Sequence, residues 1–253
     1  MLTAQQLLER AGELEQLHAP AIAEIRHVQR ANFSRILDAF HEARLSTSDL
    51  RPASGYGIGD ALRDKTERVF ALLYGAEAAL VRPQIISGTH ALAIALFGLL
   101  RPGDLLCCVT GAPYDTMEEI IGIRPSPGSL AEFGIRYAEC DLTSNPESRW
   151  QDTLAEAFGP AEPRVVLIQR SRGYKRVNSI GVGDIRRMIA SVRSIAPMCK
   201  VVVDNCYGDL LETREPTMDG ADLLASSFMK NVGAGIAPTG GYVVGTREAV
   251  SLA

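Results

Sequence analysis

Apolar residues recur along this chain first at helical spacing and later in short runs that alternate with helical segments. Residues 1–45 place apolar side chains three and four positions apart with charges between them, which predicts helix. The stretch 45–60 is rich in Gly, Pro and Ser, and it predicts an extended loop. Helical spacing returns over 61–75, where Gly75 is suited to end the helix.

From residue 78 onward the pattern predicts strands that alternate with helices. Strands are expected within 78–87, 104–111, 135–141, 164–171 and 200–205, helices within 89–100, 114–122, 148–158 and 181–196, and the runs 221–230 and 240–245 complete the series. Strands rich in Val, Ile and Leu that alternate with helices predict an α/β fold, with a mainly parallel sheet and helices on both faces. We therefore expect an N-terminal helical arm, 1–45, and one large domain, 46–253.

The amino-acid composition limits the classes of function that the protein can have. A chain of 253 residues can bury a large core, and 46% hydrophobic and 22% charged residues are typical of soluble globular proteins. A formal net charge of −4 gives no general attraction to nucleic acid or to an anionic membrane, so neither is expected as a partner. The longest apolar run, 91–100, is too short to span a bilayer.

The cysteines and histidines follow none of the spacings that mark disulfide frameworks or metal sites. The five cysteines are odd in number and include no CxxC pair, and the four histidines show no HExxH-type spacing. We therefore expect no bound metal. A reducing, cytoplasmic setting fits this cysteine usage, and the N-terminal residues match neither a signal peptide nor a mitochondrial presequence.

Two residues late in the chain suggest pyridoxal 5'-phosphate (PLP). Asp204 ends the apolar run VVVD, and Lys230 follows 26 residues later among small residues and glycines. A lysine can hold the PLP aldehyde as a Schiff base, and a carboxylate can keep the pyridinium nitrogen protonated. Taken singly, Asp204 could equally cap a helix or form a salt bridge, and Lys230 could lie on the surface.

Other motifs offer partners for such a cofactor. The segment SGTHA, 87–91, lies at a strand-to-helix junction, where backbone amides favour an anion such as a phosphate. Its alternative role is helix capping by Ser87 or Thr89. Tyr114, after the next strand, could stack on a flat ring or simply pack in the core. The basic stretch 170–176 could hold a phosphate or form a solvated loop.

No strict GxGxxG or GxxxxGK[ST] motif follows a strand, so dinucleotide-binding and P-loop functions are disfavoured. Longer runs resemble a known family instead. These runs are SGYGIGDALRDKTERVFALLYGAEAALVRPQIISGTHALAIALFGLLRPGD, GAPYDTMEEIIG, IQRSRGY, VVVDNCYGDL and SFMKNVGAGIAPTGGYVVG. From about residue 30 to the end, the chain is similar to the PLP-dependent family known as methionine gamma-lyase-like or aluminium resistance proteins, which are relatives of the cystathionine beta-lyase and gamma-synthase group.

The resemblance implies a fold-type-I PLP enzyme with specific site residues. On the family pattern, Lys230 anchors PLP, Asp204 pairs with the pyridinium nitrogen and Tyr114 stacks on the ring. The resemblance also implies phosphate contacts from Gly88, Thr89 and Ser227, with Ser226 a further candidate from its position in the sequence.

Tyr56 matches a tyrosine that reaches the phosphate of a neighbouring subunit, which implies a homodimer or homotetramer. Two positions depart from the pattern of the wider group. Ile58 replaces an arginine, for which Arg63 is a candidate substitute, and Met229 replaces a threonine. We therefore expect a phosphate site that is built differently.

The expected activity is a PLP-dependent carbon–sulfur lyase reaction on a sulfur-containing amino acid. Lys230 would act as general base, with Lys230 or Tyr114 moving protons during β- or γ-elimination to a keto acid, ammonia and a thiol. Transamination and γ-replacement are alternatives, as is an inactive remnant or partner subunit. That last alternative arises because family members continue past 251–253 into a C-terminal domain, which supplies an arginine for the substrate carboxylate. The sequence does not indicate which amino acid is the substrate.

Overall fold

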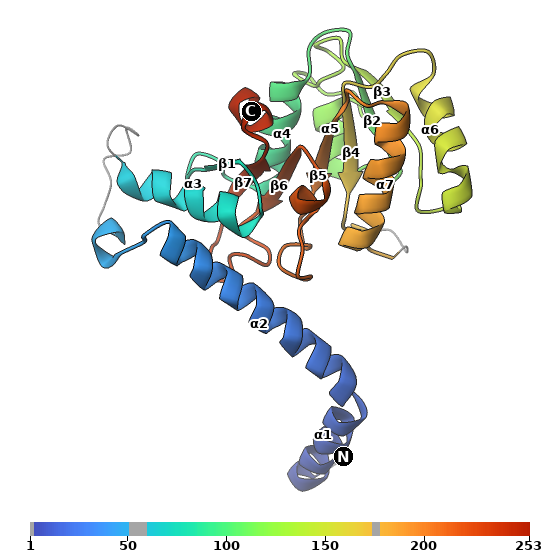
Figure 1. Ribbon diagram of the computed structural model, residues 1–253. Helices are drawn as coiled ribbons and strands as arrows, with labels where there is room; N and C mark the ends of the chain where they lie inside the picture. The colour runs from blue at the N-terminus through green and yellow to red at the C-terminus, as the bar shows by residue number, and fades with distance from the viewer. Residues whose placement is uncertain (1–2, 51–59, 174–177) are drawn as a thin grey trace.

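A central β-sheet organises the molecule (Figure 1). The structure is a computed structural model, and it describes residues 3–50, 60–173 and 178–253. Within those ranges the strands are β1 (Ala78–Val81), β2 (Leu105–Cys108), β3 (Arg136–Glu139), β4 (Val165–Gln169), β5 (Lys200–Asp204), β6 (Leu223–Ser227) and β7 (Gly241–Gly245). They form one sheet in the order β1-β7-β6-β5-β4-β2-β3. Strand β7 runs antiparallel to both of its neighbours, and the pairs from β6 to β3 are parallel.

Helices precede, connect and follow these strands. The α-helices are α1 (Ala4–Leu17), α2 (Ala19–Glu42), α3 (Ala61–Leu73), α4 (Gly88–Leu99), α5 (Asp115–Ile121), α6 (Trp150–Phe158), α7 (Val182–Ile195) and α8 (Arg247–Leu252), and the short 3₁₀ helices are Thr47–Leu50, Glu147–Arg149 and Pro216–Asp219. Local chemistry sets several of their ends. Asp60 caps α3 by accepting the Arg63 N–H, and Gly122, at φ +94°, ends α5 in the left-handed conformation that glycine adopts readily.

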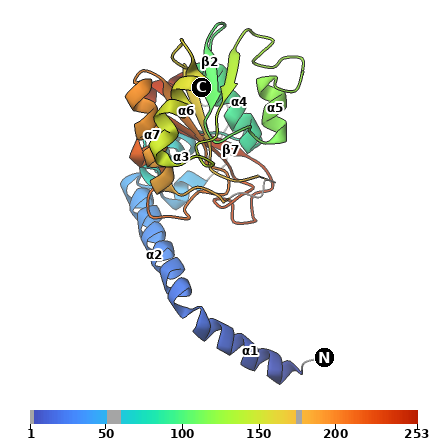
Figure 2. The same ribbon diagram turned by 90° about the vertical axis from the view of Figure 1, so that its right-hand side faces the viewer.

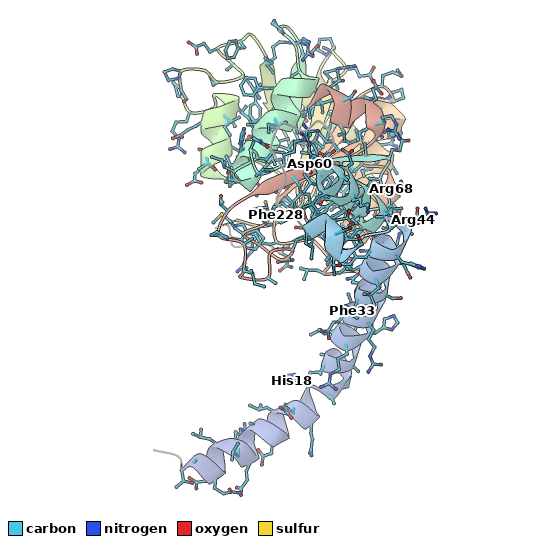
Figure 3. All side chains as sticks on the ribbon, turned by 90° about the vertical axis from the view of Figure 1, so that its left-hand side faces the viewer. His18, Phe33, Arg44, Asp60, Arg68 and Phe228 are labelled. Atoms are coloured by element: carbon cyan, nitrogen blue, oxygen red, sulfur yellow. The ribbon has the colours of Figure 1, made fainter. Side chains whose placement is uncertain are left out.

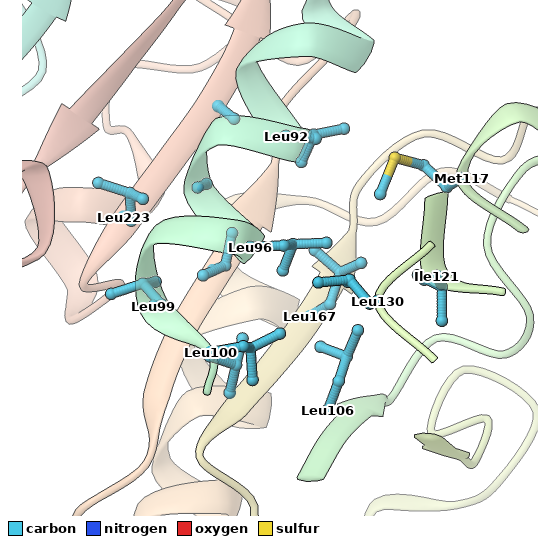
Figure 4. Close-up of a cluster of buried hydrophobic side chains, with 14 of the residues drawn as sticks. Leu92, Leu96, Leu99, Leu100, Leu106, Met117, Ile121, Leu130, Leu167 and Leu223 are labelled. Atoms are coloured by element: carbon cyan, nitrogen blue, oxygen red, sulfur yellow. The ribbon is translucent and has the colours of Figure 1, made fainter. Parts of the chain in front are cut away.

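The core lies on both faces of the sheet. On one face, α4, α5 and α8 pack on strand residues that include Leu106, Leu167 and Leu223, and Figure 4 shows leucines of α4 meeting them. On the other face, α6 and α7 cover one part of the sheet and α3 covers another. Each fully buried leucine stabilises the fold by roughly 1.5–3 kcal/mol. This layered arrangement confirms the predicted α/β class.

The N-terminal helices extend away from the sheet (Figures 1 and 2). Thr3 and Gln6 form a capping box at the start of α1, and the chain turns at His18 into α2. Helix α2 contacts α3, whereas side chains of α1 and the first part of α2 stand clear of the domain (Figure 3). Phe33 on α2 is 60% exposed. In the described ranges, no helix combines the length and apolar character needed to cross a membrane.

The structure differs from the expected elements mainly at strand ends. The strand anticipated within 78–87 ends at Val81, because residues 82–85 form a turn in which the Ile85 N–H bonds the Arg82 carbonyl. Pro83 lies inside this turn, and proline lacks the N–H that a continuing strand needs. The turn delivers the chain directly to the N-terminus of α4.

Candidate active site

A cavity of about 530 Å³ opens where the parallel strands end. Ligands in open α/β sheets collect at this edge. The cavity is lined by six of the predicted site residues, namely Gly88, Thr89, Tyr114, Asp204, Ser227 and Lys230. Tyr56, the seventh, lies outside the described residues, and so does Ile58. The structure therefore brings together residues that are spread over more than half of the sequence.

Asp204 lies in the wall of this cavity as a buried acid. Its exposed fraction is 3%, and its Oδ1 accepts the Cys206 N–H at 3.0 Å. Burial raises the pKa of Asp204 to about 6, although the Cys206 hydrogen bonds oppose that rise. Within the described residues Asp204 has no ion-pair partner. A buried carboxylate in a cavity wall fits a cationic ligand group, and the protonated pyridine nitrogen of PLP is such a group.

The first turn of α4 forms another wall. Ser87 is the N-cap, because its Oγ accepts the His90 N–H at 3.1 Å, which confirms the capping role considered for this residue. The Gly88 and Thr89 amides precede the intrahelical bonds and have no partner among the described residues. A Cβ on Gly88 would lie 2.9 Å from the Ser227 Cβ, so glycine allows the helix to approach β6 closely. These open amides suit a phosphate.

Ser227 is buried at the end of β6, and its hydroxyl already takes part in the turn that follows. Its Oγ accepts the Met229 N–H at 3.2 Å and donates to the Gly240 carbonyl at 3.3 Å. The neighbouring Ser226 points to the opposite face of the sheet, because successive strand residues alternate. The structure thus places Ser227, and not Ser226, in the cavity wall.

Lys230 follows β6 by three residues and is half-buried. Its Nζ donates to the Tyr207 hydroxyl at 2.6 Å and lies 4.1 Å from the Tyr207 ring centroid. Tyr207 has φ +66°, a left-handed conformation that is uncommon for a bulky residue, and Asn231 Nδ2 donates to its carbonyl at 3.1 Å. Sequence reasoning missed Tyr207. Its one signal was an aromatic residue three positions after Asp204.

Tyr114 is held between two strand ends. Its N–H donates to Gln169 Oε1 at 3.0 Å, and Gln169 Nε2 donates to the Ser171 carbonyl at 2.9 Å. The Tyr114 and Thr89 hydroxyls are 3.0 Å apart and share a hydrogen bond. Burial raises the pKa of Tyr114 to about 12, so the phenol is protonated at neutral pH and can donate a hydrogen bond.

Beyond Ser171, Arg172 also lines the cavity. In the described part of the chain, the Arg172 side chain has neither a hydrogen-bond nor an ion-pair partner. It follows β4, whereas Ser227 ends β6, and β5 lies between those two strands. Arg172 therefore approaches the cavity from the side away from the α4 N-terminus.

Comparison with known proteins identifies the family of this chain. The model of the family described as methionine gamma-lyase matches residues 7–253. The chain belongs to the methionine gamma-lyase family. Among curated proteins, this chain is 45% identical to the uncharacterized protein YnbB of Bacillus subtilis (strain 168). The match covers 98% of this chain and 59% of YnbB.

Solved structures of similar proteins share the fold. A Listeria innocua protein, whose assignment as a cystathionine beta-lyase involved in aluminum resistance is itself provisional, has a TM-score of 0.92 at 42% identity, over 99% of this chain and 61% of its own. A carbon-sulfur lyase involved in aluminum resistance from Clostridium novyi NT has a TM-score of 0.84 at 38% identity, over 100% of this chain and 63% of its own.

At 22% identity and a TM-score of 0.67, the pyridoxal-5'-phosphate-dependent protein YhfS of Escherichia coli shares the fold alone. The chain spans about three fifths of the length of the YnbB, Listeria and C. novyi relatives that it matches. These comparisons confirm the predicted family and fold type. The individual roles of the site residues stay predictions.

Proposed function

We propose that this chain forms the PLP site of a carbon–sulfur lyase that acts on a sulfur-containing amino acid. One observation carries the proposal: a buried carboxylate, Asp204, and a reachable lysine, Lys230, face the same cavity beside open helix amides. Lys230 would anchor PLP, and Asp204 would bind its ring nitrogen. The α4 N-terminus and Ser227 would bind the phosphate.

When bound, PLP supplies an electron sink for negative charge that develops at the substrate Cα. The protein's own groups handle the protons. The Lys230 amine would remove the Cα proton as a general base. The protonated Tyr114 phenol would then donate a proton to the departing sulfur. Cleavage of the C–S bond and hydrolysis by one water yield a thiol, a keto acid and ammonia.

The experiment that tests this proposal is product analysis of the full chain after incubation with PLP. L-cystathionine, L-methionine and L-cysteine are suitable probes. Equal amounts of keto acid, ammonia and thiol would support the lyase. Transfer of the amino group to an added keto acid, without thiol release, would favour transamination. Covalent PLP binding without turnover of any probe would favour a binding role.

Arg172 offers a binding group for the substrate carboxylate within the cavity itself, in addition to the arginine that the family resemblance places in the C-terminal domain. Among the described residues that line the cavity, Lys230 and Arg172 are the cations, and Lys230 is committed to PLP. We predict that Arg172→Gln raises KM about 10- to 100-fold with a smaller change in kcat, because a charge-assisted hydrogen bond contributes roughly 1.5–3 kcal/mol. Steady-state kinetics with a responsive amino acid measures the split.

The control for this prediction is an amine that lacks the carboxylate, such as 3-(methylthio)propylamine in place of L-methionine. Its binding, followed by the absorption of enzyme-bound PLP, should be the same in wild type and Arg172→Gln. Asp115 also lines the cavity, and Asp115→Asn is the matched charge change on the same cavity. An unchanged KM in Arg172→Gln, or an equal loss of amine binding, would contradict the assignment.

A further inference from the structure

A second cluster of polar groups lies behind the cavity, centred on Asp209. This carboxylate is fully buried. It accepts hydrogen bonds from the Tyr74 and Tyr242 hydroxyls at 2.9 Å each, from Ser226 Oγ at 2.5 Å and from Asn205 Nδ2 at 2.7 Å. The Tyr74 and Tyr242 hydroxyl oxygens are also 2.5 Å apart. None of these five residues lines the cavity.

Two of the groups that bind Asp209 are direct chain neighbours of cavity residues. Asn205 follows Asp204, and Ser226 precedes Ser227. Because side chains of successive strand residues point to opposite faces, Ser226 lies on the Tyr242 side of the sheet while Ser227 faces α4. One carboxylate thus ties the ends of β5 and β6 together from the side opposite the cavity.

The segment that carries Lys230 also contacts Asp209, through the backbone carbonyl of Asp209. Asn231 Nδ2 donates to the Asp209 carbonyl at 2.9 Å and to the Tyr207 carbonyl at 3.1 Å. Tyr207 in turn accepts the hydrogen bond from Lys230 Nζ. Asp209 therefore contacts the chain neighbours of three cavity residues, of which Asp204 lies on one stretch of chain and Ser227 and Lys230 lie on another.

The two buried phenols are protonated, which suits their contacts with Asp209. Burial raises the pKa values of the Tyr74 and Tyr242 phenols, so both remain protonated and act as donors. Burial also raises the pKa of Asp209, and the hydrogen bonds from Ser226, Tyr242, Asn205 and Tyr74 oppose that rise. The four buried donors share the acceptor at position 209, and its loss would leave each of them with one hydrogen-bond partner fewer.

We propose that Asp209 is a positioning residue of the PLP site, which holds the segments of Asp204, Ser227 and Lys230 at fixed positions relative to one another. The inference rests on the proposed PLP-binding function. It goes beyond that function because Asp209 touches neither the cavity nor any group in it. A residue that served only the stability of the fold would leave PLP binding unaffected wherever the protein stays folded.

The test compares two variants of the full chain, Asp209→Asn and Asp222→Asn. Asp222 is the matched control, because it is a largely buried carboxylate at the opposite end of β6, where it accepts the Val201 N–H at 2.7 Å and pairs with Arg193. We expect both variants to unfold at lower temperature. Only Asp209→Asn should also bind PLP at least about tenfold more weakly, and show an altered absorption band at saturating PLP.

A milder variant keeps the test decisive if Asp209→Asn does not fold. Tyr242→Phe removes one donor and leaves the carboxylate with three, so we expect a smaller loss of PLP affinity in the same direction. Wild-type PLP affinity and spectrum in the folded variants, with lowered stability alone, would overturn the inference. Failure of the unaltered chain to bind PLP would instead contradict the proposed function, so the two failures are distinguishable.

Discussion

Replacement of Lys230 by alanine is expected to abolish covalent PLP binding and turnover. Alanine has no amine to bond the cofactor aldehyde or to take the Cα proton, and loss of a general base alone lowers rates by about 10²–10⁴-fold. The Tyr207 hydroxyl would lose the hydrogen bond from Lys230 Nζ. Absorption spectra after dialysis against PLP-free buffer measure the covalent cofactor, and product assays measure the turnover.

The control for this experiment is Lys65→Ala. Lys65 lies on α3, where it bonds Asp49 and the Arg44 carbonyl, and it does not line the cavity. Its variant should retain the dialysis-resistant absorption band of the wild type. A band of wild-type strength in Lys230→Ala would exclude Lys230 as the anchor. A band lost in both variants would point to a general effect on folding.

Substitution of Asp204 by asparagine should stabilise the PLP-free chain at pH 8 and weaken the PLP-dependent activity. Burial raises the pKa of Asp204 from an ordinary value of 3.8 to about 6 in the folded chain. Between these values the folded state keeps a proton that the unfolded state has lost, so stability falls as pH rises through this window. Above it the cost is about 3 kcal/mol, and asparagine avoids it.

Urea unfolding of the PLP-free proteins at pH 5 and pH 8 measures this effect. The Asp204→Asn advantage should be larger at pH 8. Glu215 contributes a change of the same sign in both proteins, because burial raises its pKa to about 7. The exposed Asp115→Asn serves as the control, with a stability change within about 0.5 kcal/mol. An Asp204→Asn chain that is less stable than wild type at pH 8 would contradict the assigned burial cost.

The same substitution should lower activity with PLP by about 100-fold or more. Asparagine can still accept the Cys206 N–H, so the local geometry is retained. It cannot supply the negative charge that keeps the ring nitrogen protonated. Wild-type turnover in Asp204→Asn would show that this carboxylate does not serve the cofactor.

Much of the fold could be predicted because each strand carries a local signal. The run VVVD predicted β5, and its final acid marked the edge where the cavity lies. The antiparallel direction of β7 could not be predicted, because apolar alternation carries no information on strand direction. The early end of β1 at Val81 depended on a turn that overrides the apolar pattern in the following residues.

The site shows the same division between local and long-range information. Lys230 and Asp204 were predictable because their residue types are unusual in apolar and small surroundings. Tyr207 was not, because its approach to Lys230 depends on a left-handed turn in the loop after β5. Gln169 holds Tyr114 across 55 positions of sequence, and no local pattern indicates such a contact.

The position of β7 in the sheet has a consequence for how the protein is made on the ribosome. Strand β1 pairs with β7, so Ala78 cannot pair with Gly245 until the ribosome has synthesised β7. Until then Phe70 of α3, which packs on Tyr242 in the finished protein, lacks that cover. Insertion of β7 between β1 and β6 therefore follows the synthesis of every other strand of this sheet in the described part of the chain. Until β7 is made, the nascent chain carries an uncovered apolar surface of the kind that promotes misassociation.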